Sequence, residues 1–100
     1  MTEQLQTWLK GGETKRVEFK LSFGQDTIET LVAFANTEGG VVLIGVSDDK
    51  EIKGVAISAE SINNWINEVK LKTAPQLIPD AEVITVDEKM CFVWESLPIL

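Results

Sequence analysis

Residues 33–48 read AFANTEGGVVLIGVSD, and this stretch decides the fold class. Its first half completes an amphipathic run whose apolar residues recur at helical spacing: Ile28, Leu31, Val32 and Ala35. Gly39-Gly40 ends that helix, because glycine readily adopts the backbone conformation that closes a helix. Residues 41–46 then form a run without a polar face, which is typical of a central strand covered on both sides.

Upstream, residues 17–21 alternate between apolar and charged side chains, which predicts a strand with one buried face. Glu18 and Lys20 then lie on the same side of that strand. Before it, Leu5, Trp8 and Leu9 predict a short helix, capped at Thr2 and ended by Gly11-Gly12. Asp26 followed by Glu29 predicts a variant capping box that opens the second helix.

Downstream, the polar residues 47–50 end the buried strand, and residues 52–55 are predicted to return as its hairpin partner. A third helix follows Ser58, with its apolar stripe at Ile62, Trp65, Ile66 and Val69. Residues 83–86 and 90–94 predict a second hairpin. The resulting order α-β-α-β-β-α-β-β predicts an α+β (mixed α/β) fold, with helices packed on a largely antiparallel sheet.

The length of 100 residues fits one domain, residues 1–100. The chain finishes on the apolar residues 97–100, so we expect it to be the N-terminal part of a longer protein. No apolar run approaches the roughly 20 residues of a membrane span, and no signal peptide is visible. We therefore expect a cytoplasmic domain with no membrane partner.

Composition excludes several kinds of chemistry. The chain has no histidine, so it cannot supply a Ser-His-Asp triad or an HExxH zinc site. Its single cysteine, Cys91, lies in an apolar run and is predicted to be buried. The glycines precede a strand instead of following one, so no phosphate-binding or ATP-binding loop is present. The net charge of −7 argues against binding nucleic acid through bulk electrostatics.

Two groups of charged residues are candidate sites. Glu13, Glu18 and Asp48 flank the two central strands, and three converging carboxylates could hold Mg²⁺ or Mn²⁺ for phosphodiester cleavage. The alternative interpretation is a solvated strand face and an ordinary Asp-rich turn. Four of the nine basic residues fall between residues 10 and 20, and such a local stripe can contact a phosphate backbone: Lys10, Lys15, Arg16 and Lys20. Here the alternative is a stripe that serves only solvation.

Four ordered motifs carry a resemblance to a known family. They are ETKRVEFK at residues 13–20, AFANTEGG at 33–40, LIGVSD at 43–48 and IKGV at 52–55. Together they resemble the AlbA-type domain of the Schlafen family. Ser47 and Lys50 depart from the family pattern, which often has Asp and Gly at those positions.

The resemblance implies a nucleic-acid-binding module of the kind found in bacterial transcriptional regulators and helicase-related proteins. In animal Schlafens a doubled unit cleaves structured RNA with three metal-binding carboxylates, which match Glu13, Glu18 and Asp48 here. A single copy would have to form a homodimer to build such a clamp.

Our leading interpretation is a DNA-binding domain of a transcriptional regulator, forming a homodimer, with contacts from Lys15, Arg16, Lys20 and Asn36. The first alternative is a ribonuclease dependent on Mg²⁺ or Mn²⁺ that uses the three carboxylates. The second is a dimerisation or protein-interaction module without chemistry. The sequence does not choose between DNA and RNA as the partner.

Overall fold

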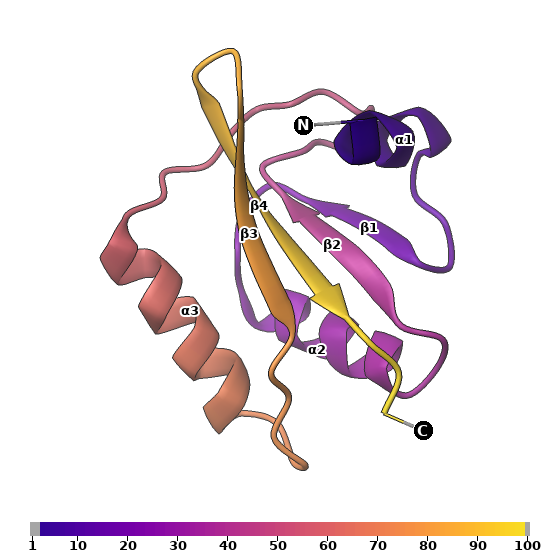
Figure 1. The fold of residues 1–100 in the computed structure, drawn as a ribbon, viewed down its shortest axis with the longest axis vertical. Helices are drawn as coiled ribbons and strands as arrows, with labels where there is room; N and C mark the ends of the chain where they lie inside the picture. The colour runs from indigo at the N-terminus through magenta and orange to yellow at the C-terminus, as the bar shows by residue number, and fades with distance from the viewer. Residues whose placement is uncertain (1–2, 100) are drawn as a thin grey trace.

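The computed structural model describes residues 3–99, which form a four-stranded sheet with helices on both faces (Figure 1). The elements are α1 (Glu3–Gly11), β1 (Val17–Lys20), α2 (Gln25–Ala35), β2 (Gly40–Ile44), α3 (Ala59–Leu71), β3 (Asp80–Val86) and β4 (Lys89–Ser96). The strand order is β1-β2-β4-β3; β1 is parallel to β2, and the other two pairs are antiparallel. The predicted α+β fold with a largely antiparallel sheet is confirmed.

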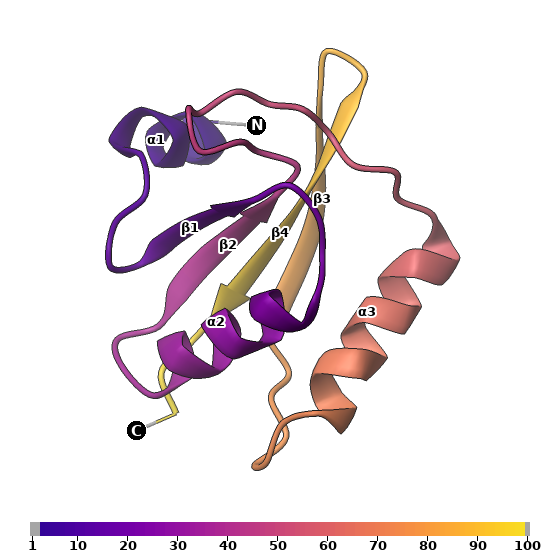
Figure 2. The ribbon, with the colours of Figure 1, turned by 180° about the vertical axis from the view of Figure 1, so that it is seen from behind.

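β2 is the central strand, and all five of its residues are buried. Val42 and Ile44 face the layer formed by α2 and α3, which Figure 2 shows from behind. Val41 and Leu43 face the opposite side, where α1 packs. The run without a polar face is therefore explained by a helix layer on each side of the strand.

The sheet separates two apolar clusters. The buried members of the larger cluster, on the α2 and α3 side, are Ile28, Leu31, Phe34, Ala35, Val42, Ile44, Val69, Leu77, Phe92 and Trp94. Those of the smaller cluster, on the α1 side, are Leu5, Leu9, Phe19, Val41, Leu43, Val46, Cys91 and Val93. The predicted burial of Cys91 is confirmed, and burial raises the pKa of its thiol. That shift works against a thiolate nucleophile.

The connection from α2 to β2 depends on its two glycines. Gly39 has a φ of +84°, and its N–H donates to the carbonyl oxygen of Phe34. A Cβ on Gly39 would lie 2.6 Å from the carbonyl oxygen of Ser96, and one on Gly40 would lie 2.6 Å from the Phe34 ring. The connection therefore passes too close to its neighbours to accept a side chain.

The predicted strand over residues 52–55 is wrong. Only an isolated bridge joins Val46 to Ile52, and residues 53–55 form no strand. Gly45 and Gly54 both have positive φ, and the N–H groups of Lys53 and Gly54 both donate to the Gly45 carbonyl. This turn redirects the segment, and the Val55 N–H donates to Met90 at the start of β4.

Three smaller predictions also differ from the structure or lie outside it. β1 ends at Lys20, so Leu21 is exposed and does not extend the buried face. Gly24, not Asp26, is the N-cap of α2, and Thr27 Oγ1 accepts a hydrogen bond from the Gly24 N–H at 3.2 Å. The cap predicted at Thr2 lies outside the described residues.

The remaining elements follow the sequence closely. Ser58 caps α3, its Oγ accepting a hydrogen bond from the Ser61 N–H at 3.1 Å. β3 and β4 pair continuously from Asp80 opposite Glu95 to Val86 opposite Lys89, which confirms the second hairpin. No helix within residues 3–99 combines the length and apolar character needed to cross a membrane.

Replacing Gly39 with alanine is expected to lower the free energy of unfolding by at least ~1–2 kcal/mol, because a Cβ is strained at positive φ and would contact Ser96. The measurement is urea unfolding followed by circular dichroism. Gly11→Ala is the matched control, since no atom lies within 4 Å of its added Cβ and Gly11 belongs to α1. Equal stability of the Gly39 variant and the natural chain would contradict this account of the connection.

Candidate nucleic-acid interface

Lys20, at the end of β1, forms ion pairs with two carboxylates. Its Nζ lies 3.4 Å from a carboxylate oxygen of Glu18 and 3.1 Å from one of Asp26 in α2. The Lys20 side chain is only 13% exposed. Burial alone would lower its pKa, but the Asp26 hydrogen bond and the charges of Asp26 and Glu18 outweigh that effect and raise it. The hydrogen bond from Lys20 in turn lowers the pKa of Asp26.

Glu13 lies beside the outer edge of β1. Its Oε2 accepts a hydrogen bond of 3.0 Å from the backbone N–H of Phe19. The chain reaches this position through a tight turn, in which Thr14 bridges to Val17. Glu13 therefore supplies an acceptor to an amide on an edge strand, where water or another chain would otherwise bind it.

Asp48 lies in the turn that follows β2, beyond the carboxyl ends of the two parallel strands. The turn is closed by a 3.0 Å hydrogen bond from the Lys50 N–H to the Ser47 carbonyl, and Ser47 Oγ also donates to Asp49. Asp48 is exposed, and no hydrogen bond or ion pair joins its carboxylate to another residue in the range 3–99. The turn presents it to solvent.

These positions do not present the three carboxylates as one ligand set. Within residues 3–99, no group of three or more Asp, Glu or Cys side chains is close enough to hold a metal ion. Glu13 instead binds a backbone amide, and Glu18 pairs with Lys20. Metal binding by Glu13, Glu18 and Asp48 stays a prediction.

The predicted nucleic-acid contacts fall at both ends of β1. Lys15 and Arg16 precede the strand, whereas Lys20 ends it and is held by two carboxylates. Arg16 donates from Nη2 to the carbonyl of Glu38 at 3.0 Å, two residues beyond Asn36. Lys15, Arg16 and Asn36 thus lie near the amino ends of β1 and β2, and Lys20 is apart from them.

Asn36 opens onto a hollow of about 270 Å³ on the α2 side of the sheet. Val32, Ala35 and Leu77 give this hollow an apolar floor, and Lys72 and Thr73 border it after α3. No hydrogen bond from another described residue occupies the side-chain amide of Asn36. An amide so placed is available to a base edge or a phosphate oxygen.

Lys50 is a basic residue that sequence reasoning missed. Its Nζ donates to the carbonyl oxygen of Lys10 at the end of α1, at 3.3 Å. A cation at this position is favoured by the partial negative charge of a helix C-terminus. The contact also places two ammonium groups on one surface, although Lys10 and Lys50 are forty residues apart. No local pattern could have found it.

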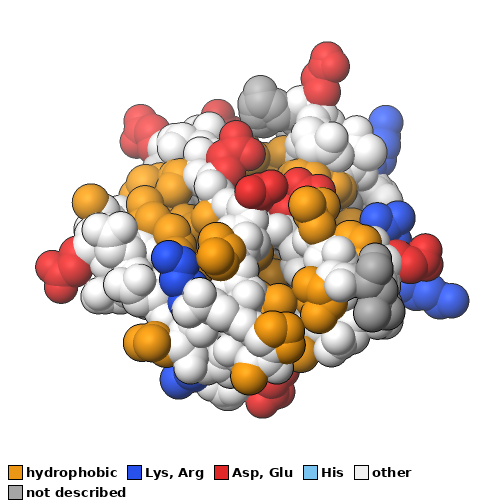
Figure 3. Space-filling view, turned by 60° about the horizontal axis from the view of Figure 1, so that its bottom comes forward, with side chains coloured by type: hydrophobic (Ala, Val, Ile, Leu, Met, Phe, Trp, Pro, Cys, Tyr) orange, Lys and Arg blue, Asp and Glu red, His pale blue; other side chains and the backbone are white. Residues whose placement is uncertain are grey.

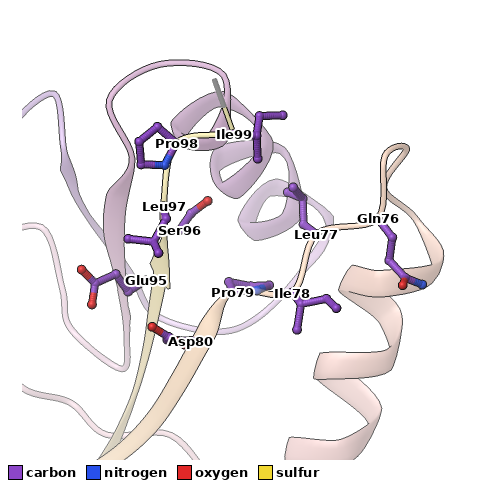
Figure 4. Close-up of a pocket in the computed structure, with 10 residues that line it drawn as sticks. All are labelled: Gln76, Leu77, Ile78, Pro79, Asp80, Glu95, Ser96, Leu97, Pro98 and Ile99. Atoms are coloured by element: carbon purple, nitrogen blue, oxygen red, sulfur yellow. The ribbon is translucent and has the colours of Figure 1, made fainter.

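A second hollow opens where β3 and β4 diverge at the end of the sheet. It has a volume of about 180 Å³ and is lined by residues 76–80 and 95–99 (Figure 4). Ile78 and Leu97 are exposed there, and Figure 3 shows hydrophobic side chains on the surface at this end. None of its lining residues is Lys or Arg, whereas Asp80 and Glu95 contribute carboxylates. The lining of this hollow therefore does not fit a phosphate backbone.

Comparison with known proteins adds two findings. A family model described as Schlafen, AlbA_2 matches residues 13–98. The chain is also similar in structure to the DIP2311 protein of Corynebacterium diphtheriae, with a TM-score of 0.70 and 16% sequence identity. That match covers 96% of this chain and 24% of the other, so this chain spans about a quarter of that protein's length. At this identity the likeness shows the shared fold.

Replacing Lys20 with glutamine is expected to lower the free energy of unfolding by about 1 kcal/mol or less, because one of its partners is well exposed. Because folding raises the pKa of Lys20, its charged form stabilises the folded state at pH values below the ordinary pKa of 10.5. This contribution is lost as the pH rises through the folded-state pKa. Because folding lowers the pKa of Asp26, its carboxylate stabilises the folded state at pH values above 3.8. This contribution is lost as the pH falls through the folded-state pKa. The difference between variant and natural chain should therefore be largest between these limits.

Chemical unfolding across this pH range measures the effect. Lys53→Gln is the control, since the Lys53–Glu51 pair is half-exposed on both sides and should add almost nothing. An unfolding difference for Lys20→Gln that does not shrink in acid would contradict the pairing with Asp26.

Proposed function

The chain belongs to the Schlafen AlbA_2 family, and we propose that it is a nucleic-acid-binding module whose contact surface lies along β1. Family membership suggests a role related to nucleic acid. Within that role, our proposal is a cytoplasmic DNA-binding domain of a transcriptional regulator, acting as a homodimer.

The observation that supports this surface is the uneven distribution of basic residues across the sheet. Lys10, Lys15, Arg16 and Lys50 lie along α1, its connection to β1 and the turn after β2; we call these four the β1 margin. The β3–β4 hairpin at the opposite edge carries one basic residue, Lys89, and five acidic ones: Asp80, Glu82, Asp87, Glu88 and Glu95. The surface around the β1 margin also contains carboxylates, among them Glu13, Glu18 and Asp48, so the two edges differ in their basic residues: four lie at the β1 edge and one in the hairpin. A phosphate backbone would find its cationic partners at the β1 edge.

Within this proposal the predicted contacts have different roles. Lys15 and Arg16 of the β1 margin contact phosphates, and Asn36 reaches a base or sugar from the neighbouring end of α2. Lys20 is restrained by Glu18 and Asp26, so it serves mainly to position β1 against α2. Lys50 joins the surface through its contact with Lys10.

Neutralising the β1 margin is expected to weaken nucleic-acid binding. A plot of log affinity against log salt has a negative slope. In a Lys15→Gln, Arg16→Gln double variant this slope should become less steep by roughly 0.7–0.9 for each phosphate contact removed. Fluorescence anisotropy with labelled duplex DNA and labelled single-stranded RNA measures both affinity and slope. Lys89→Gln is the control for charge alone, because Lys89 lies in the acidic hairpin. Loss of affinity in the control equal to half that of the double variant would contradict a localised surface.

The ribonuclease alternative is tested in the same titration. With Mn²⁺ present, cleavage of labelled tRNA that stops in EDTA and in Glu18→Gln would establish a nuclease that uses this carboxylate. Binding without cleavage supports the non-catalytic module that we propose. If neither nucleic acid binds at low salt, the protein-interaction module becomes the better interpretation.

A further inference from the structure

β3 has an unpaired outer edge. Within residues 3–99 its only strand partner is β4, and the pairing runs over seven residues without a bulge. Asp80–Val86 contains no proline or lysine, which commonly protect an edge strand, and its only charged residues are Asp80 and Glu82. Every second residue of β3 therefore directs an N–H and a C=O away from the sheet with no strand to bind them.

Helix α3 extends past this edge. In Figures 1 and 2 it runs beside β3, outside the sheet, while Trp65 reaches back to pack edge-on against Phe92 of β4 at 5.3 Å. Val69 is fully buried, but Ile62, Trp65 and Ile66 are only half-buried although they form the apolar stripe of the helix. Part of the stripe therefore remains exposed on a helix that runs beside the free edge of β3.

On the opposite face of the same edge the first half of β3 is acidic, whereas Ile84 and Val86 pack against the cluster on the α1 side. Asp80 and Glu82 alternate with Ala81 and Val83 along β3, and Asp80 lies directly opposite Glu95 of β4. No ion pair joins any of these three carboxylates to a basic group in the described part of the chain. Like charges on paired strand positions destabilise a sheet, and a neighbouring cation would relieve that repulsion.

We propose that the β3 edge binds an extended segment of a partner protein in which basic and apolar residues alternate. The segment adds a fifth strand to the sheet through backbone hydrogen bonds. Because side chains of a strand alternate between faces, its apolar residues would lie beneath the uncovered stripe of α3. Its basic residues would lie beside Asp80 and Glu82. Strand edge, helix and carboxylates thus specify the same period-2 pattern.

A second copy of this chain fits the edge less well. Antiparallel pairing of β3 with β3 around a two-fold axis would bring both α3 helices to the same face of one junction. It would also join two chains that each carry a net charge of −7. β3 and β1 are the two outer strands of the sheet, although Arg16 and Glu82 line one hollow between them. The two proposals are tested with different ligands, a peptide and a nucleic acid, so the failure of one leaves the other standing.

The test uses the 100-residue chain and a fluorescein-labelled heptapeptide of alternating lysine and valine. A peptide of the same composition with its four lysines preceding its three valines has the same charge without the alternation. We expect the alternating peptide to bind on the order of tenfold more tightly in fluorescence anisotropy, since only it satisfies both faces. Equal affinity of the two peptides would overturn the proposal.

Two protein variants locate the contact. Glu82→Lys is expected to weaken binding on the order of fivefold, whereas Glu29→Lys, an equal charge change on the exposed side of α2, should leave it unchanged. Equal weakening by both would show bulk attraction and overturn the proposal. Trp65→Ala, with folding verified by circular dichroism, should also weaken binding because it removes part of the uncovered stripe.

Amide hydrogen exchange read by NMR decides the geometry without any variant. Added strand pairing should slow exchange at alternate residues of β3 when the alternating peptide is bound. Protection at β1, or protection nowhere in β3, would overturn the proposal. Protection of β3 that grows with protein concentration in the absence of peptide would identify a second copy as the occupant and overturn it as well.

Discussion

Burial of β2 on both faces is the constraint on which the other elements depend. Its five residues have no exposed side, so the chain must supply a helix layer above and below it and a strand on each edge. α1 covers one face, and α2 with α3 covers the other. β1 pairs with β2 in parallel, which requires a crossover, and α2 provides that crossover and part of the larger cluster together. One apolar run therefore accounts for most of the architecture.

The same constraint places the polar residues. Because β1 and β2 are parallel, their carboxyl ends lie together at one end of the sheet, where Lys20 and the turn with Asp48 are found. Their amino ends lie together at the other end, where Arg16 donates to the Glu38 carbonyl near Asn36. The motifs that are separate in sequence are thus divided between two ends of one strand pair, with Glu13 against the outer edge of β1.

The two free edges of the sheet differ in chemistry, and this difference matters more than net charge. β1 is short, its Phe19 amide is occupied by Glu13, and Lys15, Arg16 and Lys20 lie at its two ends. β3 is longer, has no comparable protection, and carries carboxylates on one face. A domain with net charge −7 can therefore offer basic side chains to a nucleic acid at one edge and carboxylates to a basic segment at the other.

The sequence by itself determined the periodic elements: the buried strand, the amphipathic helices and the β3–β4 hairpin, because their side-chain periods reflect which face is covered. It also determined the family, through motifs at fixed spacing. Only the tertiary structure decided that residues 52–55 turn away instead of pairing, since glycine torsions at Gly45 and Gly54 set that path. It alone decided the contacts Lys20–Asp26 and Lys50–Lys10, and that α3 extends past β3. These features depend on how elements distant in sequence pack together, and the side-chain period within one element carries no information about that packing.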